Sequence, residues 1–170
     1  KKGMDVVSSD AVRKDLESEE RFGREVDMQK VFRVVDGILL SKVREGKDVI
    51  YDATNTEGQH RERKLKRFQK EGIRVCGVMM MASKETAKKR NSLREVGSGL
   101  VPGWAIDNMF ETFRKEPVNT EKEFFDEIIA VDEEGHEYKL YDREVASETG
   151  KEVRVSPREF SPFQPKGRQR

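Results

Sequence analysis

The chain has 170 residues, of which 39% are charged and 34% hydrophobic, and its formal net charge is +1. This length is typical of one domain with a core of its own, and the near balance of charge restricts any nucleic-acid site to a local patch. No apolar run approaches the ~20 residues of a membrane helix, so we expect no membrane association. The single cysteine, Cys76, excludes an internal disulfide and favours a reducing, cytoplasmic compartment.

The chain alternates between predicted strands and helices. Apolar residues follow helical spacing in some stretches and form short β-branched runs in others. The predicted order is strand 4–8, a helical segment after it, helix 24–45, strand 48–55, helix 58–71, strand 73–82, helix 84–95, loop 96–103, helix 104–115, strand 127–132 and strand 138–142. Strands that alternate with helices at this spacing predict a parallel α/β sheet.

Composition divides the chain into a core and a tail. The strand over 73–82 is apolar on both faces, which indicates a central parallel strand. The apolar content falls beyond residue 142. We therefore expect a core over residues 1–142, with a lid at about 84–103, and a charged, flexible tail over 143–170.

Asp10 follows the first predicted strand, and Arg13 comes three residues later. Ligands in open α/β sheets bind beyond the carboxyl ends of the strands, so both side chains can face such a ligand. A carboxylate fixed at a strand end can act as a general base for a hydroxyl, and a guanidinium suits a phosphate. The alternative is that Asp10 only caps the helix that follows.

Asp52 closes the second predicted strand and is followed by Ala53, Thr54 and Asn55. An Asp that ends an apolar strand in an α/β fold is the Walker-B arrangement, which holds Mg²⁺ directly or through water. The alternative is a strand-end turn, because Asp, Thr and Asn all favour turns. The residues alone leave both interpretations open.

Arg90 and Arg94 are spaced i,i+4 on the predicted helix 84–95, which also carries Lys84, Lys88 and Lys89. The usual explanation of such a run is a solvated face. However, like charges at this spacing destabilise a free helix, and a glycine-rich loop follows. A basic helix before a hinge loop is typical of a lid that closes over phosphates.

Other conspicuous residues favour structural roles. The basic helix over 61–70 could bind nucleic acid, but the exposed face of a crossover helix is the simpler explanation. His60 and His136 are isolated in the sequence, and no Cys/His spacing indicates a metal site. Trp104 is expected to be a packing anchor at the start of its helix, with a place in the site as the alternative.

Four segments follow the order and spacing of a known family. They are VVSSDAVRKDL, VIYDATN, AKKRNSLREVGSGLVPGWAIDNMF and FDEIIAVD, within residues 4–132. Together they resemble the P-loop polynucleotide 5′-hydroxyl kinases, the end-healing kinases of phages and bacteria. The R-N-S-x-R lid before Val-Pro is the most specific part, and D-A-T-N is shared more widely among P-loop kinases. The resemblance implies a three-layer α/β P-loop fold with ATP and Mg²⁺ as cofactors.

The resemblance also implies roles for residues on the acceptor side. Asp10 would activate the 5′-hydroxyl as the general base. Arg13 would hold the acceptor end, near the terminal nucleotide or its 3′-phosphate. Thr54 and Asn55 would shape the floor of the substrate site.

On the donor side, the resemblance places Arg90 and Arg94 over the ATP phosphates, with Arg94 stabilising the transition state. Asp52 would belong to the outer shell of Mg²⁺. Catalysis in such an enzyme is positioning together with electrostatic stabilisation.

One motif of the family is absent from the 170 residues. The family needs G-x-x-x-x-G-K-[ST], whose amides and Lys bind phosphates and whose Ser or Thr holds Mg²⁺. The pairs Gly46-Lys47 and Gly150-Lys151 lack both the upstream glycine and the following Ser or Thr. Lys1-Lys2-Gly3 resembles a helix end. We therefore expect an N-terminal truncation that splits the sheet at its middle, with a degenerate, non-catalytic descendant as the alternative.

The sequence thus predicts a kinase that moves the γ-phosphate of ATP to the 5′-hydroxyl of a polynucleotide, DNA or RNA, although this chain is expected to be inactive alone. One alternative is a P-loop kinase for another hydroxyl, such as a nucleoside, a modified base or a small metabolite. The other is a non-enzymatic module that binds nucleic-acid ends or a partner through its basic helices.

Overall fold

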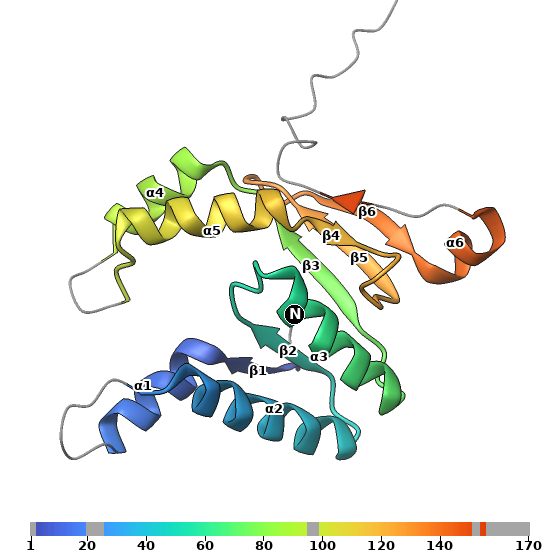
Figure 1. The fold of residues 1–170 in the computed structure, drawn as a ribbon, viewed down its shortest axis with the longest axis horizontal. Helices are drawn as coiled ribbons and strands as arrows, with labels where there is room; N and C mark the ends of the chain where they lie inside the picture. The colour runs from blue at the N-terminus through green and yellow to red at the C-terminus, as the bar shows by residue number, and fades with distance from the viewer. Residues whose placement is uncertain (1–2, 20–25, 95–98, 151–153, 156–170) are drawn as a thin grey trace, which may run out of the picture. The chain divides into compact units, whose positions relative to one another are not determined.

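The computed structural model describes residues 3–19, 26–94, 99–150 and 154–155. Its elements follow in the order β1 α1 α2 β2 α3 β3 α4 α5 β4 β5 β6 α6 β7 (Figure 1). The predicted α/β fold with parallel strands is confirmed. The chain forms two compact units, one up to Thr54 and one from Asn55 onward, so the predicted core over 1–142 is divided. No helix in the described ranges is long and apolar enough to cross a membrane.

The first unit is a two-stranded parallel sheet covered by two helices. Its elements are β1 (Asp5–Ser8), α1 (Ser9–Glu19), α2 (Met28–Arg44) and β2 (Val49–Asp52). Helix α2 packs on both strands and on α1, and it buries Val31, Val35, Leu39 and Leu40. It begins at Met28, later than predicted, because the Asp27 side chain caps it by accepting a hydrogen bond from the Gln29 amide at 2.9 Å.

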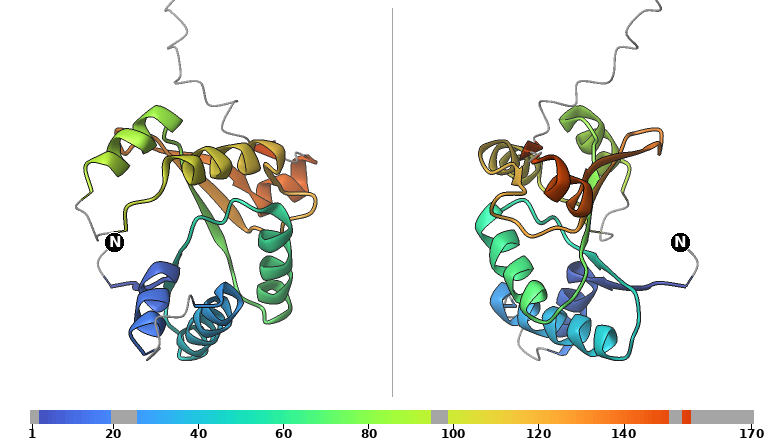
Figure 2. Two further views of the ribbon diagram at one scale, coloured as in Figure 1. Left: turned by 60° about the vertical axis from the view of Figure 1, so that its left-hand side comes forward. Right: turned by 90° about the vertical axis from the view of Figure 1, so that its right-hand side faces the viewer.

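The second unit contains a three-stranded sheet and the remaining helices. Strand β3 pairs in parallel with β5, which pairs antiparallel with β6, and β4 forms a separate antiparallel pair with β7. Its elements are α3 (Gly58–Lys70), β3 (Cys76–Met80), α4 (Lys84–Ser92), α5 (Gly103–Lys115), β4 (Val118–Asn119), β5 (Glu127–Val131), β6 (Glu137–Asp142), α6 (Arg143–Thr149) and β7 (Arg154–Val155). Helices α4 and α5 lie side by side in Figures 1 and 2.

The core of the second unit forms where α3 covers one face of the sheet. It contains the buried side chains of Leu65, Met79, Val118, Phe125, Ile128 and Tyr141. Gly77 of β3 allows a close approach at this point, because a Cβ there would lie 3.0 Å from the ring of Phe125. A side chain at position 77 would require the Phe125 ring to shift by a few tenths of an ångström.

The prediction that residues 73–82 form a central strand is wrong for the described part of the chain. Within the described ranges, strand β3 pairs only with β5 and is an edge strand of its sheet. Its outer face is open, since the side chains of Val78 and Met80 are 54% and 69% exposed. The two parallel pairs, β1–β2 and β3–β5, belong to separate sheets.

The prediction of a flexible tail from residue 143 is also wrong in its first part. Residues 143–149 form α6, which Asp142 caps by accepting a hydrogen bond from the Glu144 amide. Arg143 fixes the start of this helix, because it donates to the Phe125 carbonyl at 2.9 Å and its guanidinium lies over the Phe124 ring. The remainder of the predicted tail, apart from β7, lies outside the described residues.

A buried ion pair joins three segments of the second unit. The Arg61 side chain, on α3, is 6% exposed and lies 2.7 Å from the carboxylate of Glu123, which is 4% exposed. The guanidinium also donates to the carbonyls of Asn55, Thr56 and Glu116, at 2.7–3.0 Å. All five N–H donors of this Arg are therefore used. The expectation that the basic residues over 61–70 form an exposed face is wrong for Arg61, which is buried.

We expect Arg61→Met to lower the free energy of unfolding by about 3–5 kcal/mol, because it leaves the Glu123 carboxylate buried without its partner. Arg63→Met, on the exposed side of the same helix, is the matched control and is expected to change stability by less than about 0.5 kcal/mol. Urea denaturation followed by circular dichroism measures both. Equal losses in the two variants would show that the pair does not hold this unit together.

Candidate functional site

Strands β1 and β2 end at the same level, so their carboxyl ends form one edge of the first unit. Ser8, the last residue of β1, is the register partner of Asp52, the last residue of β2. Asp10 lies two residues beyond Ser8, in the first turn of α1. The structure thus brings the predicted base, Asp10, and the predicted Mg²⁺ residue, Asp52, to the same sheet edge.

Asp10 and Arg13 are in direct contact on α1. The Arg13 guanidinium donates to the Asp10 carboxylate at 3.3 Å and lies 4.0 Å from that of Glu17. The Asp10 side chain is 79% exposed, which leaves its carboxylate open to a hydroxyl from solvent or substrate. Because β1 ends at Ser8 and α1 begins at Ser9, Asp10 lies inside the helix and is not its N-cap residue.

The segment after β2 contains an unusual backbone conformation. Asp52 and Thr54 are exposed at the end of the first unit, and Asn55 begins the second. Asn55 has a φ of +47°, the only positive φ of a non-glycine among the described residues. Asn tolerates this region better than most residues, and Arg61 holds its carbonyl at 3.0 Å. The sequence contains no signal for this role of Arg61, which lies within a run of basic residues.

Helix α4 and the segment before α5 are held together by a side-chain amide. Asn91 donates to the Val101 carbonyl at 2.8 Å and accepts from the Val101 amide at 2.9 Å. Lys88 and Lys84 pair with Asp107 of α5, at 2.7 and 3.5 Å. The hydrogen bond from Lys88 holds the pKa of Asp107 below its ordinary value. The Asp107 carboxylate therefore supplies part of the negative charge that the lysines of α4 are expected to attract from phosphates.

The two predicted lid arginines contact backbone carbonyls. Arg90, in the last turn of α4, donates to the Glu133 carbonyl at 3.3 Å, and Arg94 donates to the Gly99 carbonyl at 2.9 Å. Both side chains belong to exposed residues. The prediction that they share a helix over 84–95 is wrong, because α4 ends at Ser92 and Arg94 lies beyond it. The part of the predicted lid between residues 94 and 99 lies outside the described residues.

The turn between β5 and β6 anchors the start of α4. The Glu133 carboxylate accepts from the Ser83 amide at 2.7 Å and from the Thr86 hydroxyl at 2.9 Å. These hydrogen bonds, with that from the Ser83 amide the strongest, lower the pKa of Glu133. Ser83 is the N-cap of α4, as its sequence position predicts, and accepts from the Thr86 amide. A carboxylate at a helix N-terminus is also favoured by the helix dipole.

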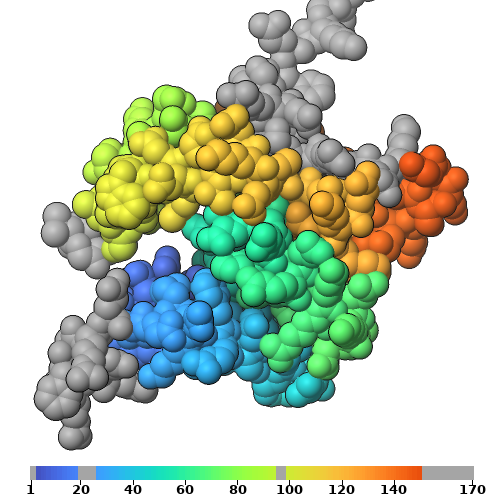
Figure 3. Space-filling view, viewed as in Figure 1, coloured from blue at the N-terminus to red at the C-terminus, as the bar shows by residue number. Residues whose placement is uncertain are grey.

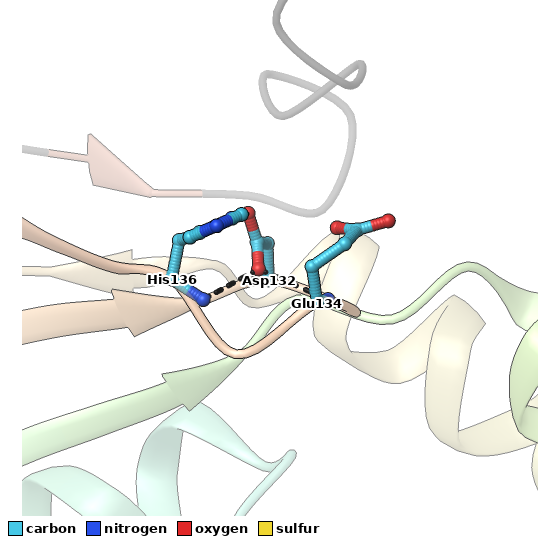
Figure 4. A group of neighbouring side chains, drawn as sticks. All are labelled: Asp132, Glu134 and His136. Carbon is cyan, nitrogen blue, oxygen red and sulfur yellow. Dashed lines mark hydrogen bonds and ion pairs between the residues drawn. The ribbon is translucent and has the colours of Figure 1, made fainter.

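The same turn brings His136 beside two acidic residues, so the expectation that this His is isolated is wrong. Ligand atoms of Asp132, Glu134 and His136 lie within 4.8 Å of one another (Figure 4). Asp132 accepts from the amides of Glu134 and His136, from the His136 ring at 3.1 Å and from the Tyr138 hydroxyl at 3.0 Å. Burial opposes its ionised form, but these hydrogen bonds outweigh burial and lower its pKa. Its lone pairs are thus engaged in stabilising the turn.

The predicted site residues fall into one group in each unit. Asp10, Arg13, Asp52 and Thr54 belong to the first unit, and Asn55, Arg90 and Arg94 belong to the second. A cavity of about 290 Å³ lies between β6 and α6 and is lined by none of these residues.

The residues present satisfy only part of the donor set that ATP and Mg²⁺ need. Asp52 offers an exposed carboxylate at a strand end, and Arg90 and Arg94 offer exposed guanidiniums. The amide loop and Lys that hold the β- and γ-phosphates are not among the 170 residues. Each of these groups, taken within its own unit, is of a kind that binds a metal ion or phosphates, and the 170 residues do not contain the phosphate cradle.

Comparison with known proteins gives one family and one structural likeness. No curated protein matches the sequence. Among solved structures, the chain is similar to the tunicamycin resistance protein of Deinococcus radiodurans, with 16% sequence identity, a TM-score of 0.47, and coverage of 92% of this chain and 87% of that one. A family model, AAA_33, described as an AAA domain, matches residues 1–116. Because this match covers more than half of its residues, the chain belongs to the AAA_33 family of AAA domains.

Proposed function

We propose that this domain takes part in the transfer of a phosphoryl group from ATP to a hydroxyl. AAA domains have a P-loop nucleotide-binding fold, which generally binds ATP with Mg²⁺. The observation that carries the proposal is the shared edge of β1 and β2, where Ser8 pairs with Asp52 and the exposed Asp10 follows within two residues. A base and a metal-binding carboxylate on adjacent strand ends are what this reaction requires.

Two classes of acceptor fit this proposal. The family match supports a nucleotide or another small hydroxyl compound more directly, because it identifies a P-loop domain and no polynucleotide-specific feature. The S-S-D-x-x-R and R-N-S-x-R segments support the 5′-hydroxyl of a polynucleotide. Steady-state competition between 5′-hydroxyl oligonucleotides and nucleosides, in an active form of the enzyme, separates the two. Phosphorylation of the small compounds alone would reject the polynucleotide.

A purely binding role through the basic helix α3 has less support. Arg61 is buried, and Lys66 pairs with Glu62 at 2.6 Å. The positive charge left for a nucleic acid on this helix is therefore smaller than the sequence indicates. A domain that only bound ends would also not need an exposed carboxylate at the end of each parallel strand of its first unit.

In the proposed reaction, each residue of this chain acts through its charge or its proton affinity. The Asp10 carboxylate accepts the proton of the attacking hydroxyl, and Arg13 beside it orients the acceptor. ATP with Mg²⁺ supplies the phosphoryl group and neutralises much of its charge. Arg90 and Arg94 add positive charge on the lid, and Asp52 carries the negative charge that attracts the cation.

The 170-residue chain is expected to bind ATP weakly and to show no transfer of labelled γ-phosphate to any hydroxyl acceptor. The reason is the absent G-x-x-x-x-G-K-[ST] sequence, whose backbone amides supply most of the phosphate contacts. Isothermal titration calorimetry and a radiolabel assay measure the two properties. Robust phosphorylation by this chain would contradict the expectation.

Asp10→Asn is expected to lower kcat by about 10²–10⁴-fold in an active form of the enzyme that includes a phosphate-binding loop, because the general base is lost. ATP affinity and thermal stability are expected to stay nearly unchanged, since the side chain is exposed and Asn keeps its shape. Asp15→Asn, an exposed Asp on the same helix, is the control. If Asp10→Asn instead unfolds the protein while the folded fraction stays active, Asp10 is a structural residue.

Arg94→Ala is expected to lower kcat by up to roughly 10³–10⁵-fold in the same active form, the range for arginines that stabilise a phosphoryl-transfer transition state. Arg94→Lys is expected to restore little of this, because Lys lacks the planar guanidinium. Lys89→Ala removes an exposed positive charge from α4 and is the matched control. Full activity in Arg94→Lys would show that any positive charge at position 94 is sufficient and that the guanidinium has no specific role.

A further inference from the structure

Trp104, the single Trp of the chain, is open to solvent. Its side chain lies in the first turn of α5 and is 69% exposed, so the prediction of a packing anchor is wrong. Leu93 and Leu100, which flank the same part of the lid, are 78% and 52% exposed. We call these three residues the lid patch. Trp is enriched at binding interfaces, where its ring contributes a large contact area.

The lid patch is held in place by polar contacts of its neighbours. The Asn91 side chain forms hydrogen bonds with both the carbonyl and the amide of Val101. Val101 lies between Leu100 and Trp104 in the chain. These hydrogen bonds therefore hold this segment at the end of α4, where Leu93 lies. Arg94 donates to Gly99, the residue before Leu100. Helix α5 itself is fixed by the buried Ile106 and by Asp107. Trp104 is therefore presented on an anchored helix, and Figure 3 shows α4 and α5 as one continuous surface.

The charge around the lid patch identifies the kind of partner. Residues 84–94 carry five cationic side chains, Lys84, Lys88, Lys89, Arg90 and Arg94, and one acidic side chain, Glu85. Asp107 neutralises the first two of these only in part. Arg90 lies in the field of the Glu133 carboxylate and, after the hydrogen bond from the Ser83 amide, also lowers its pKa. Among the ion pairs of the described residues, Lys89 and Arg94 have no acidic partner. Trp104 lies on a helix that packs against the basic helix α4. An aromatic ring together with nearby positive charge is the combination that binds single-stranded nucleic acid, by stacking on bases and attracting phosphates.

From this geometry we propose that Trp104 is the stacking platform for a nucleobase of a single-stranded acceptor end, with the positive charge of the neighbouring helix α4 attracting its phosphates. The proposal rests on the proposed function only in naming the acceptor; the binding itself is a property of this chain. Stacking on a flat ring tolerates any base. We therefore expect binding to depend on the presence of bases and little on their sequence.

The fluorescence of the single Trp tests the proposal on the chain as it stands. Titration with a 5′-hydroxyl oligonucleotide of six nucleotides is expected to quench the Trp104 emission saturably. Ribose 5-phosphate and inorganic phosphate, which lack a base, are expected to leave it unchanged. Quenching by inorganic phosphate to the same extent would mean that the site binds an anion only, which would overturn the stacking assignment.

Variants of the patch give an independent measurement. Anisotropy of the same oligonucleotide, labelled at its 3′ end, is expected to show a Kd about 5–150-fold higher for Trp104→Ala, the range for loss of one stacked base. Trp104→Phe keeps an aromatic ring and is expected to stay within about 3-fold of the unmodified chain. Val145→Ala, which shortens another exposed apolar side chain, is the control. Equal affinity of Trp104→Ala and Val145→Ala would reject the platform.

Three further outcomes separate the assignments. Quenching by ATP without quenching by the oligonucleotide would place the donor nucleotide at Trp104 and overturn the acceptor assignment. Self-association that Trp104→Ala abolishes, measured by analytical ultracentrifugation, would make a second copy the partner and also overturn it. Trp104-dependent binding of an oligonucleotide that an active form never phosphorylates would support the platform and reject the polynucleotide acceptor under the proposed function.

Discussion

The second unit depends on one buried guanidinium. Burying a charged side chain lowers the stability of the folded state by several kcal/mol or more unless its hydrogen-bond donors are satisfied. Arg61 has an acceptor for each of its five N–H donors. Those partners come from the segment before α3, from the end of α5 and from the loop before β5. The charge is therefore tolerated only when these segments occupy the positions seen here. The left-handed Asn55 is one consequence of this arrangement, because its carbonyl is among the five partners.

Helix α4, part of the predicted lid, is held by interactions of a different kind. Helix α4 buries no residue, and its anchors are hydrogen bonds and ion pairs at the surface: Glu133 at its start, Asp107 along its side and Val101 at its end. Exposed ion pairs contribute little to stability, and elements with few buried apolar contacts open at the lowest free energy. The unit thus combines a rigid frame around Arg61 with a helix that can open locally without unfolding the rest. This is the mechanical property that a phosphate-closing lid needs.

The amino-acid pattern predicts the elements well where the pattern is local. Short β-branched runs identify the strands that end at Ser8 and Asp52, and the rule for parallel α/β sheets then predicts that Asp10 and Asp52 share one edge, which the strand register confirms. The functional roles of these residues stay predictions. The family match confirms the P-loop class and goes no further toward the acceptor.

Features that depend on contacts between distant segments leave no such signal in the sequence. Arg61 looks like the other basic residues of α3, and only its encounter with Glu123, 62 positions away, makes it a buried residue. Trp104 is a large aromatic residue of the kind that usually anchors packing, yet no segment of the described chain covers it. The scarcity of apolar residues beyond 142 predicts a tail, although the Asp142 cap and the contacts of Arg143 with Phe124 and Phe125 fix the start of α6.

The open edge of β3 has a consequence for how the isolated chain behaves. Among the described residues, β3 pairs with another strand along one side only, and its Val78 and Met80 add exposed apolar surface. Natural proteins block such edges with charges, bulges or covering segments, because an open edge is a template for pairing with another chain. In the described part of β3, CGVMM, none of the five residues is charged. Recombinant chain at high concentration is therefore expected to associate strand to strand through this edge.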